Sequence, residues 1–426
     1  MRNTNGVKYT IRMRNRKNYV VVLFILMSAM AFAQSGDYNK YPFVNADIDT
    51  LAYSPTALKS FFTKLKEVKE GKRKNVVVVH IGDSHLQADF FTSWVRQRLQ
   101  EDYGNGGRGL VFPYRVAGSN EPNNYHSSGK GDWKGRRCVI VNPSSIPTGI
   151  AGFGLRTTDS ASILKMNIRN GDALDYSFTK MTLLHDKGPG CYNWVVYTSD
   201  DFKDSVIIKD TGKVYGIAAD TIVFKDTVSS FTMCTEQTDS SQNEAMVFGM
   251  VISNGKPGLV YNTIGSNGAR YSDFNRSAYF IQQLAGLKPD LVIVSLGTNE
   301  AYAKRFNPDY FADDIDTMLS NIKHVAPDAD LLLTSPNDAY RGHRYKNPDL
   351  PDAVSTLRKE AIKYDAAFWD FYHIMGGYGS MQKWYVKHLC QKDHVHFTGG
   401  GYTLQAELFY DALQKAIKNG LESTPK

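Results

Sequence analysis

Cysteine is scarce in this sequence. The 426 residues contain only Cys138, Cys191, Cys234 and Cys390, and no Cys-x-x-Cys pair. Four thiols spread from residue 138 to residue 390 do not form the dense disulfide framework of small secreted domains, and the missing pair argues against a zinc ribbon. The first three lie in one region of the chain, so the sequence leaves a single bridge there open.

Long apolar runs are missing after residue 33, and the positive charge is concentrated before it. Residues 1–33 hold six Lys and Arg residues and no acidic residue. These six positive charges account for all but one unit of the formal net charge of +7. An apolar run over 19–27 and the small-residue site Ala31-Phe32-Ala33 follow. This order predicts a secretory signal peptide, cleavage before Gln34, and export to the periplasm or out of the cell. An uncleaved anchor is the alternative, but the apolar run is short for a membrane span.

The charge distribution also limits the partners. Because the basic balance belongs to the targeting segment, it gives no support to a nucleic-acid partner. No run after residue 33 is long enough to cross a membrane, so we expect no stable membrane span after cleavage. The sequence does not indicate the oligomeric state.

The overall composition is that of a globular protein. Apolar residues make up 42% and charged residues 22% of the chain, which excludes disorder, collagen and a coiled coil as the main architecture. The length predicts two domains, or one α/β domain with a large insertion.

Two parts of the chain alternate strands with helices. The β-branched run 75–81 is typical of a strand buried on both faces of a parallel sheet, and a predicted helix over 87–100 follows it. The second part has predicted strands at 290–295, 331–334 and 366–371 and predicted helices at 308–325, 351–364 and 402–417. Strand–helix alternation of this kind predicts an α/β domain.

The segment between these parts has a different character. From about 113 to 261 it is rich in Ser, Thr, Asp, Asn and Gly, with short alternating runs that predict an antiparallel β-sandwich. We therefore expect a signal peptide at 1–33, an α/β domain made of 34–112 and 262–426, and an inserted β-rich module at 113–261.

Three polar clusters carry candidate chemistry. Gly82-Asp83-Ser84-His85 follows the first buried strand, so Ser84 lies at the carboxyl end of a central strand, where ligands bind in open α/β sheets. A serine hydroxyl needs a base, and Asp393-His394-Val395-His396 offers one. A carboxylate three residues before a histidine can accept its Nδ1–H and orient Nε2 toward a serine, which favours His396 over His394.

The third cluster and a glycine-rich turn could stabilise negative charge. Asn299 in Gly297-Thr298-Asn299-Glu300 follows a predicted strand and could donate to a developing oxyanion. Gly265-Ser266-Asn267-Gly268 offers backbone N–H groups that no Cβ shields.

Together these segments resemble the SGNH (GDSL-type) hydrolases. Ser84, Gly268, Asn299 and His396 match the four residues for which that family is named, and Asp393 matches its triad acid. The resemblance covers about residues 74–112 and 262–418. It implies a flavodoxin-like three-layer α/β/α fold, a carboxylic ester hydrolase with a Ser–His–Asp mechanism, and no cofactor or metal.

The same resemblance implies an oxyanion hole. Its donors are the backbone N–H groups of Ser84 and Gly268 and the side-chain amide of Asn299. Two positions depart from the family pattern: His85 stands where many members have leucine, and Glu300 where many have aspartate.

Within the family, the chain looks like the peptidoglycan O-acetylesterases. The large β-rich insertion, the segment Gly265–Ala269 and the export signal carry this likeness. It implies an O-acetylated glycan as substrate and an inserted module that resembles a carbohydrate-binding domain.

Other functions stay open at this point. The same triad would serve a deacetylase of another polysaccharide or of sialic acid, and a vestigial triad would leave an exported glycan-binding protein. A two-metal phosphoesterase could use Asp83, His85, His394 and His396 as ligand pairs, although the histidine expected after Asn299 is missing.

Overall fold

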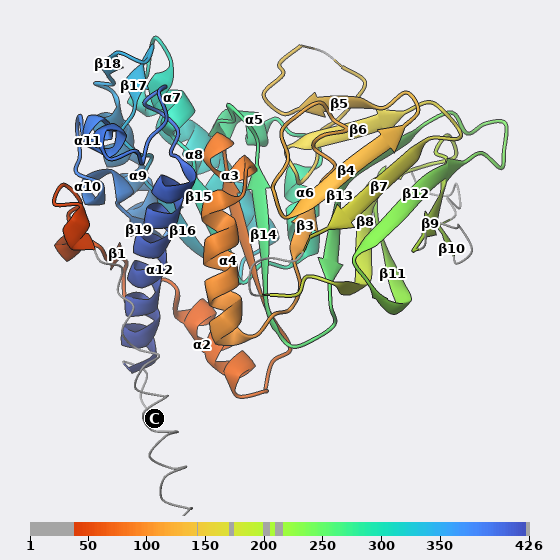
Figure 1. Ribbon diagram of the computed structural model, residues 1–426, viewed down its shortest axis with the longest axis horizontal. Coiled ribbons are helices and arrows are strands. Elements are labelled where there is room, and N and C mark those ends of the chain that lie inside the picture. Colours follow the sequence, from red (N-terminus) through yellow and green to blue (C-terminus); the bar gives the residue numbers. More distant parts are fainter. Residues whose placement is uncertain (1–37, 143, 170–173, 199–204, 209–215, 423–426) are drawn as a thin grey trace, which may run out of the picture. The chain divides into compact units, whose positions relative to one another are not determined.

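The computed structural model describes residues 38–142, 144–169, 174–198, 205–208 and 216–422 (Figure 1). The predicted signal peptide, residues 1–33, lies outside the described residues. The 3-10 helix η1 (Tyr38–Lys40) belongs to a first unit that ends at Tyr41, and everything described below belongs to the second unit, Pro42–Lys426.

A six-stranded sheet forms the centre of the α/β domain. In spatial order its strands are β1 (Leu51–Ala52), β19 (Ala367–Trp369), β16 (Asp330–Thr334), β15 (Leu291–Ser295), β2 (Asn75–Gly82) and β14 (Gly258–Gly265). All pair in parallel except β1, which runs antiparallel to β19. The parallel strands follow the flavodoxin-like order, and the order reverses between β2 and β15.

Helices cover both faces of this sheet. The helices α2 (Lys59–Lys69), α4 (Phe90–Tyr103) and α12 (Gly399–Glu422) pack together on one face, and α5 (Tyr271–Asn275), α6 (Phe280–Leu287), α8 (Pro308–Val325) and α9 (Leu350–Lys363) pack on the other (Figure 1). Local sequence signals explain where helix α8 forms. Asn307 caps it by accepting hydrogen bonds from two backbone N–H groups, and Pro308 occupies its first position. Its buried residues follow helical spacing.

The smaller elements of the α/β domain are short. They comprise η2 (Ala46–Ile48), α3 (Ser84–Gln87), α7 (Thr298–Tyr302), β17 (Tyr340–Arg341), β18 (Tyr345–Lys346), α10 (Phe371–Ile374) and α11 (Met381–Val386). The turns that begin α3 and α7 directly follow β2 and β15, so they lie at the carboxyl edge of the sheet.

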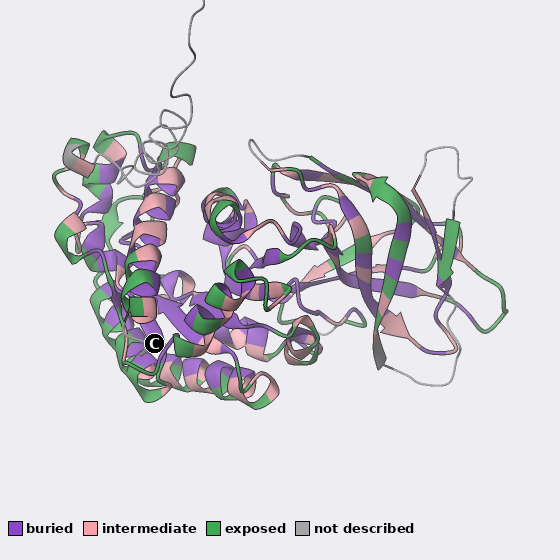
Figure 2. Cartoon of the chain, turned by 90° about the horizontal axis from the view of Figure 1, so that it is seen from below, coloured by how far each residue is buried: buried purple, intermediate pink, exposed green. Residues whose placement is uncertain are grey.

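The inserted module consists of two antiparallel sheets. One has the order β10 (Ser205–Ile208), β9 (Asn193–Tyr197), β12 (Ser230–Glu236), β7 (Ile163–Ile168) and β4 (Tyr125–Lys130). The other has the order β11 (Gly216–Val228), β8 (Phe178–Lys187), β13 (Ala245–Ser253), β6 (Phe153–Thr157) and β5 (Lys134–Arg137), with β3 (Gly109–Val111) on β13. A separate buried apolar cluster lies in this module, and Figure 2 shows the buried positions along its strands.

The predicted fold class is therefore confirmed: a three-layer α/β/α domain carries an inserted antiparallel β-module. The predicted module, 113–261, leaves out β3 at its start and ends inside β14. Strand β3 pairs with module strand β13, and β14, which crosses residue 261, pairs with β2 in the parallel sheet. Composition could not separate these strands because both kinds of sheet use the same apolar residues.

Two other expectations meet the structure here. All four cysteines are free, so the disulfide left open by the sequence is not formed. Within the described residues, no helix combines the length and apolar character needed to cross a membrane.

Candidate active site

Ser84 sits at the sharp turn from β2 into α3. Gly82 ends the strand, and a Cβ at this position would come within 2.9 Å of the Ser295 carbonyl oxygen, so the close approach of β2 and β15 requires glycine. Asp83 then caps α3 by accepting a hydrogen bond of 2.9 Å from the His85 N–H. The turn lies at the point where the strand order reverses, which is where open α/β sheets bind ligands.

Ser84, His396 and Asp393 form a hydrogen-bonded row. Ser84 Oγ lies 2.8 Å from His396 Nε2, and His396 Nδ1 lies 2.6 Å from Asp393 Oδ2. Residues 84 and 393–396 are far apart in sequence, so the fold alone brings them together. In this geometry Nδ1–H donates to the carboxylate and Nε2 is left to accept the serine proton.

Asp393 is held as a carboxylate. Its Oδ1 accepts hydrogen bonds from the backbone N–H groups of Val395 and His396, at 2.9 and 3.0 Å. Burial raises the pKa of Asp393, but the hydrogen bond from His396 and these two N–H groups outweigh it, so the pKa lies below its ordinary value.

His394 points elsewhere. Its Nε2 lies 3.1 Å from Gln382 Oε1, and its ring packs against the rings of Tyr340 and Tyr385. The structure thus places His396, and not His394, beside Ser84.

The predicted oxyanion donors gather around Ser84. Ser84, Gly268 and Asn299 line the same cleft. Gly268 has a φ of +80°, which favours glycine, in the turn after β14. The Asn299 side chain is already engaged, because its Nδ2 donates to Asp83 Oδ2 and to the Ala269 carbonyl oxygen, both at 3.0 Å. A bond to an oxyanion would therefore require one of these contacts to be released or shared.

The two departures from the family pattern are both buried behind the cleft. The His85 ring lies 5.1 Å from the His396 ring, and its Nδ1 is 3.0 Å from the Tyr402 hydroxyl. Burial, followed by the neighbouring His396, lowers the pKa of His85 to about 3, so this ring is neutral near pH 7. Burial raises the pKa of Glu300 to about 8, and its Oε1 accepts from the Tyr271 N–H at 2.8 Å.

Residues to which the sequence analysis assigned no role complete the cleft. They comprise Ala88, Phe90, Asn120, Asn267, Thr298, Tyr302, His343, Gln391, Val395 and Tyr402. Phe90 is 43% exposed and stacks on Tyr402, whereas its neighbour Phe91 is buried. Helical periodicity alone could not decide which of the two phenylalanines faces the cleft.

The inserted module reaches this cleft through Asn120. The Asn120 Oδ1 atom accepts from Gln87 Nε2, at 3.1 Å, and from Asn267 Nδ2, at 2.5 Å. An amide from the module is thereby fixed beside the turns that carry Ser84 and Gly268. No sequence signal marks this contact, because Asn120 lies in a polar loop.

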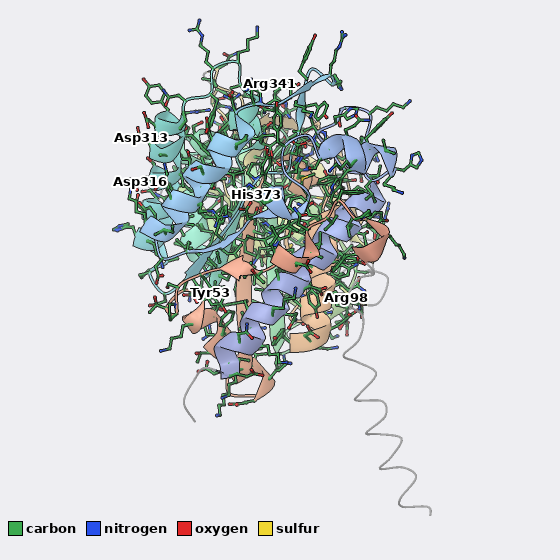
Figure 3. All side chains as sticks on the ribbon, turned by 90° about the vertical axis from the view of Figure 1, so that its left-hand side faces the viewer. Tyr53, Arg98, Asp313, Asp316, Arg341 and His373 are labelled. Carbon is green, nitrogen blue, oxygen red and sulfur yellow. The ribbon has the colours of Figure 1, made fainter. Side chains whose placement is uncertain are left out.

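The loop that carries His343 is anchored by Arg341. This residue, labelled in Figure 3, donates to the carbonyl oxygens of Ala301 and Ala303 and pairs with Asp349. These contacts tie β17 to α7, and His343, just beyond β17, lines the cleft. The loop that carries His343 is therefore held by an ion pair and hydrogen bonds.

The ligands of the phosphoesterase alternative do not come together as one set, because His85 lies near His396 but His394 points away from both. His85 packs against Tyr402, and His394 lies by Gln382. In the part of the chain that the structure describes, no group of three or more His, Cys, Asp and Glu side chains is placed to hold a metal ion.

Comparison with known proteins agrees with this geometry. Residues 230–404 match the model of the GDSL-like lipase/acylhydrolase family, and no curated protein matches the chain. A solved structure described as a peptidoglycan O-acetylesterase in action superposes with a TM-score of 0.70 at 23% identity, covering 88% of this chain and 98% of that one. This likeness extends over the α/β domain and the module and establishes a shared fold.

Two other solved structures match with TM-scores of 0.30 and below. One is a family two carbohydrate esterase from Clostridium thermocellum, with a TM-score of 0.30 and 12% identity over 62% of this chain and 95% of that one. The other is a GDSL-like lipase from Bacteroides thetaiotaomicron, with a TM-score of 0.28 and 21% identity over 37% of this chain and 76% of that one.

Proposed function

We propose that this chain, whose residues 230–404 match the GDSL-like lipase/acylhydrolase family model, is an exported serine esterase that removes O-acetyl groups from a carbohydrate, with peptidoglycan as its substrate. The proposal depends on one observation, the row in which His396 lies 2.8 Å from Ser84 and 2.6 Å from Asp393. Export follows from the signal-like residues 1–33.

In the proposed mechanism Ser84 is the nucleophile. His396 Nε2 takes the hydroxyl proton as Ser84 Oγ attacks the acetyl carbonyl carbon, and Asp393 stabilises the imidazolium that forms. The tetrahedral oxyanion is held by the N–H groups of Ser84 and Gly268 and by Asn299, which exchanges one of its present hydrogen bonds for this contact.

Collapse of the tetrahedral species breaks the ester bond. His396 gives its proton to the departing sugar oxygen, and the acetyl group stays on Ser84. Water then attacks the acetyl-enzyme, with His396 accepting its proton, and releases acetate and free Ser84.

The cleft supports a carbohydrate as the group that carries the acetyl. Asn120, Asn267 and Gln391 offer amides that hydrogen-bond hydroxyls, and the exposed ring of Phe90 offers a stacking surface. The solved structure that shares this fold over 88% of the chain is described as a peptidoglycan O-acetylesterase. In this proposal the inserted module supplies Asn120 to the substrate cleft.

An acetate-release screen tests the proposal. The purified protein and Ser84→Ala are incubated with O-acetylated peptidoglycan, acetylxylan, acetylated sialic acid and p-nitrophenyl acetate. We expect release from peptidoglycan by the unchanged protein, insensitive to chelator and abolished by a serine-directed phosphonate or by Ser84→Ala. Acetate release from another glycan alone would assign that glycan as the substrate in place of peptidoglycan. Hydrolysis of aryl esters alone would reject the proposal that the substrate is a carbohydrate. Glycan binding without acetate release would favour a glycan-binding protein.

A further inference from the structure

A second concave surface lies at the amino-terminal edge of the parallel sheet, where the module meets the α/β domain. Its walls come from the start of β2 and β14, from α6, and from module strands β8, β11 and β13. Seven residue steps along β2 separate Asn75 from Gly82, so this groove lies about 23 Å from the turn that holds Ser84. We refer to it as the seam groove.

The seam groove carries positive charge at its rim. Lys74 belongs to the α/β domain, and Lys180 and Lys256 belong to the module, and all three are exposed. Among the described residues that line the groove, none is acidic. Three like charges around one concavity attract an anion, because low-dielectric walls focus their field.

The floor of the groove is aliphatic. The apolar lining residues are Val77, Leu184, Ala218, Ala219, Val251, Val260 and Leu287. Since the described lining includes no aromatic ring, the groove offers no stacking surface for a sugar. Small aliphatic side chains fit this lining better than a glycan does.

A buried amide donor is left without a partner in this groove. Gln283 is 3% exposed, and its Oε1 accepts from the Ile150 N–H at 2.7 Å, which fixes the orientation of the amide. Its Nε2 has no hydrogen-bond partner among the described residues, although Gln283 lines the groove. Buried polar groups are normally satisfied, so this unpartnered donor in the lining of the groove is a candidate partner for an acceptor such as a peptide carbonyl.

From these four features together we infer that the seam groove is a second, non-catalytic site that binds a short acidic peptide with small aliphatic side chains. The lysines bind its carboxylates, Gln283 Nε2 donates to a backbone carbonyl, and the aliphatic floor accepts its side chains. Binding here involves no bond making and leaves the Ser84 cleft unoccupied.

Titration calorimetry with N-acetyl-Ala-Glu-Ala tests this inference, and the uncharged N-acetyl-Ala-Gln-Ala amide and chitotetraose serve as comparison ligands. We expect saturable binding of the charged peptide that weakens as salt is raised, because salt screens exposed charges. The uncharged peptide should bind at least about tenfold more weakly, and chitotetraose should show no binding that depends on the groove.

Two variants assign the binding to the groove. Lys74→Ala with Lys180→Ala should weaken charged-peptide binding by about tenfold or more, whereas Lys134→Ala with Lys359→Ala, two exposed lysines outside the groove, should leave it unchanged. Lys256 is not chosen because its charge also acts on Asp175.

A further variant, with a single substitution, fills the groove. Gly286 lines it on α6, and a Cβ there meets no atom within 4 Å, so Gly286→Trp places a ring in open space. It should abolish charged-peptide binding while p-nitrophenyl acetate hydrolysis stays within about twofold, since Ser84 is remote. Undiminished peptide binding in Gly286→Trp, equal binding of the uncharged peptide, or chitotetraose binding that Gly286→Trp removes would each overturn the inference.

Discussion

The Nδ2 atom of Asn299 donates a hydrogen bond of 3.0 Å to Oδ2 of Asp83, the residue immediately before the serine of the hydrogen-bonded row. Its other hydrogen goes to the Ala269 carbonyl oxygen, also at 3.0 Å. The amide proposed for the oxyanion hole is therefore held in position between the turns after β2 and β14. In the proposed mechanism, it reaches a developing oxyanion by exchanging a bond that it already makes.

We predict that Asn299→Ala lowers kcat for p-nitrophenyl acetate by roughly 100- to 1,000-fold, as expected for the loss of one oxyanion donor. The comparison variant is Asn267→Ala, which removes another cleft amide that contacts Asn120. Its kcat on this small ester should fall far less, while its KM for the acetylated glycan rises. Equal kcat losses in the two variants would reject a specific role for Asn299.

His85 is expected to support His396 without carrying a proton. The two rings are 5.1 Å apart, and burial followed by His396 lowers the pKa of His85 to about 3. We predict that His85→Leu keeps kcat within about tenfold and leaves the pH dependence of kcat/KM unchanged, because a group that stays neutral across the working range adds no titration. The measurement is the pH–rate profile of both proteins.

Tyr402→Phe is the matched control for this prediction. It removes the hydroxyl that lies 3.0 Å from His85 Nδ1 but keeps both rings. Like His85→Leu, it should lower stability by roughly 1 kcal/mol without moving the pH profile. If the acidic limb of the pH–rate profile shifts in His85→Leu but not in Tyr402→Phe, His85 is a group that titrates during catalysis.

Much of this architecture could be predicted from the sequence. The β-branched run of β2 and the Asn307–Pro308 start of α8 are local signals, and the structure has both elements where these signals put them. Ser84, Asp393 and His396 could be proposed because short motifs carry them. The three-residue spacing of Asp393 and His396 predicts their 2.6 Å contact, but the 2.8 Å contact of His396 with Ser84 could only be hypothesised, since it joins segments 312 residues apart.

Other features depend on contacts that leave no local pattern. Strand β1 has two residues and exists because Leu51 and Ala52 pair with the edge strand β19. Asn120 enters the cleft only because the module packs beside Gln87. The seam groove exists only because two parts of the chain meet, so no single segment predicts it.

Gly268 tests the geometry of the proposed oxyanion hole. Its φ of +80° is strained for any residue with a Cβ, although a Cβ there would meet no atom within 4 Å. We predict that Gly268→Ala destabilises the fold by about 1 kcal/mol and lowers kcat by at least about tenfold, because relaxation of the backbone moves its N–H.

Gly286→Ala separates this effect from a general cost of alanine. Gly286 lies in helix α6 with ordinary φ and equally open surroundings, so alanine there should stabilise the protein by about 0.5–1 kcal/mol and leave kcat unchanged. Thermal unfolding and p-nitrophenyl acetate kinetics of both variants are the measurements. Full activity of Gly268→Ala would reject the proposal that the Gly268 N–H stabilises the oxyanion.

Asp89 joins the helix after the serine turn to the segment that leads into the module. It accepts from Arg96 at 2.7 Å, from Arg108 at 2.9 Å and from Asn124 at 2.6 Å, and the carboxylate and both arginines are almost fully buried. We predict that Asp89→Ala costs about 3–5 kcal/mol of unfolding free energy, because it leaves two buried cations without their carboxylate.

Denaturant unfolding measures this cost, with Glu101→Ala as the control. Glu101 pairs with Arg98 at 3.1 Å on the surface of the same helix, where an ion pair contributes at most about 1 kcal/mol. Similar losses in the two variants would mean that the buried network does not stabilise the fold.

Glu300 makes the stability of the protein depend on pH. Burial raises its pKa to about 8, from an ordinary value of 4.5. The folded protein therefore holds this proton more tightly than the unfolded chain does. The resulting stability is fully present below about pH 4.5 and is lost as pH rises through 8, by up to about 1.4 kcal/mol per pH unit.

We predict that Glu300→Gln is progressively more stable than the unchanged protein as pH rises from 5 to 8. Glutamine keeps an oxygen that can accept from the Tyr271 N–H, as Glu300 Oε1 does at 2.8 Å, but it has no proton to lose. Asp83, whose pKa burial raises to about 6, titrates in both proteins, and its charge also raises the pKa of Glu300, so the difference between their unfolding free energies reports Glu300 together with its interaction with Asp83. Denaturant unfolding at several pH values measures it, and a difference that stays constant with pH would show that Glu300 titrates normally.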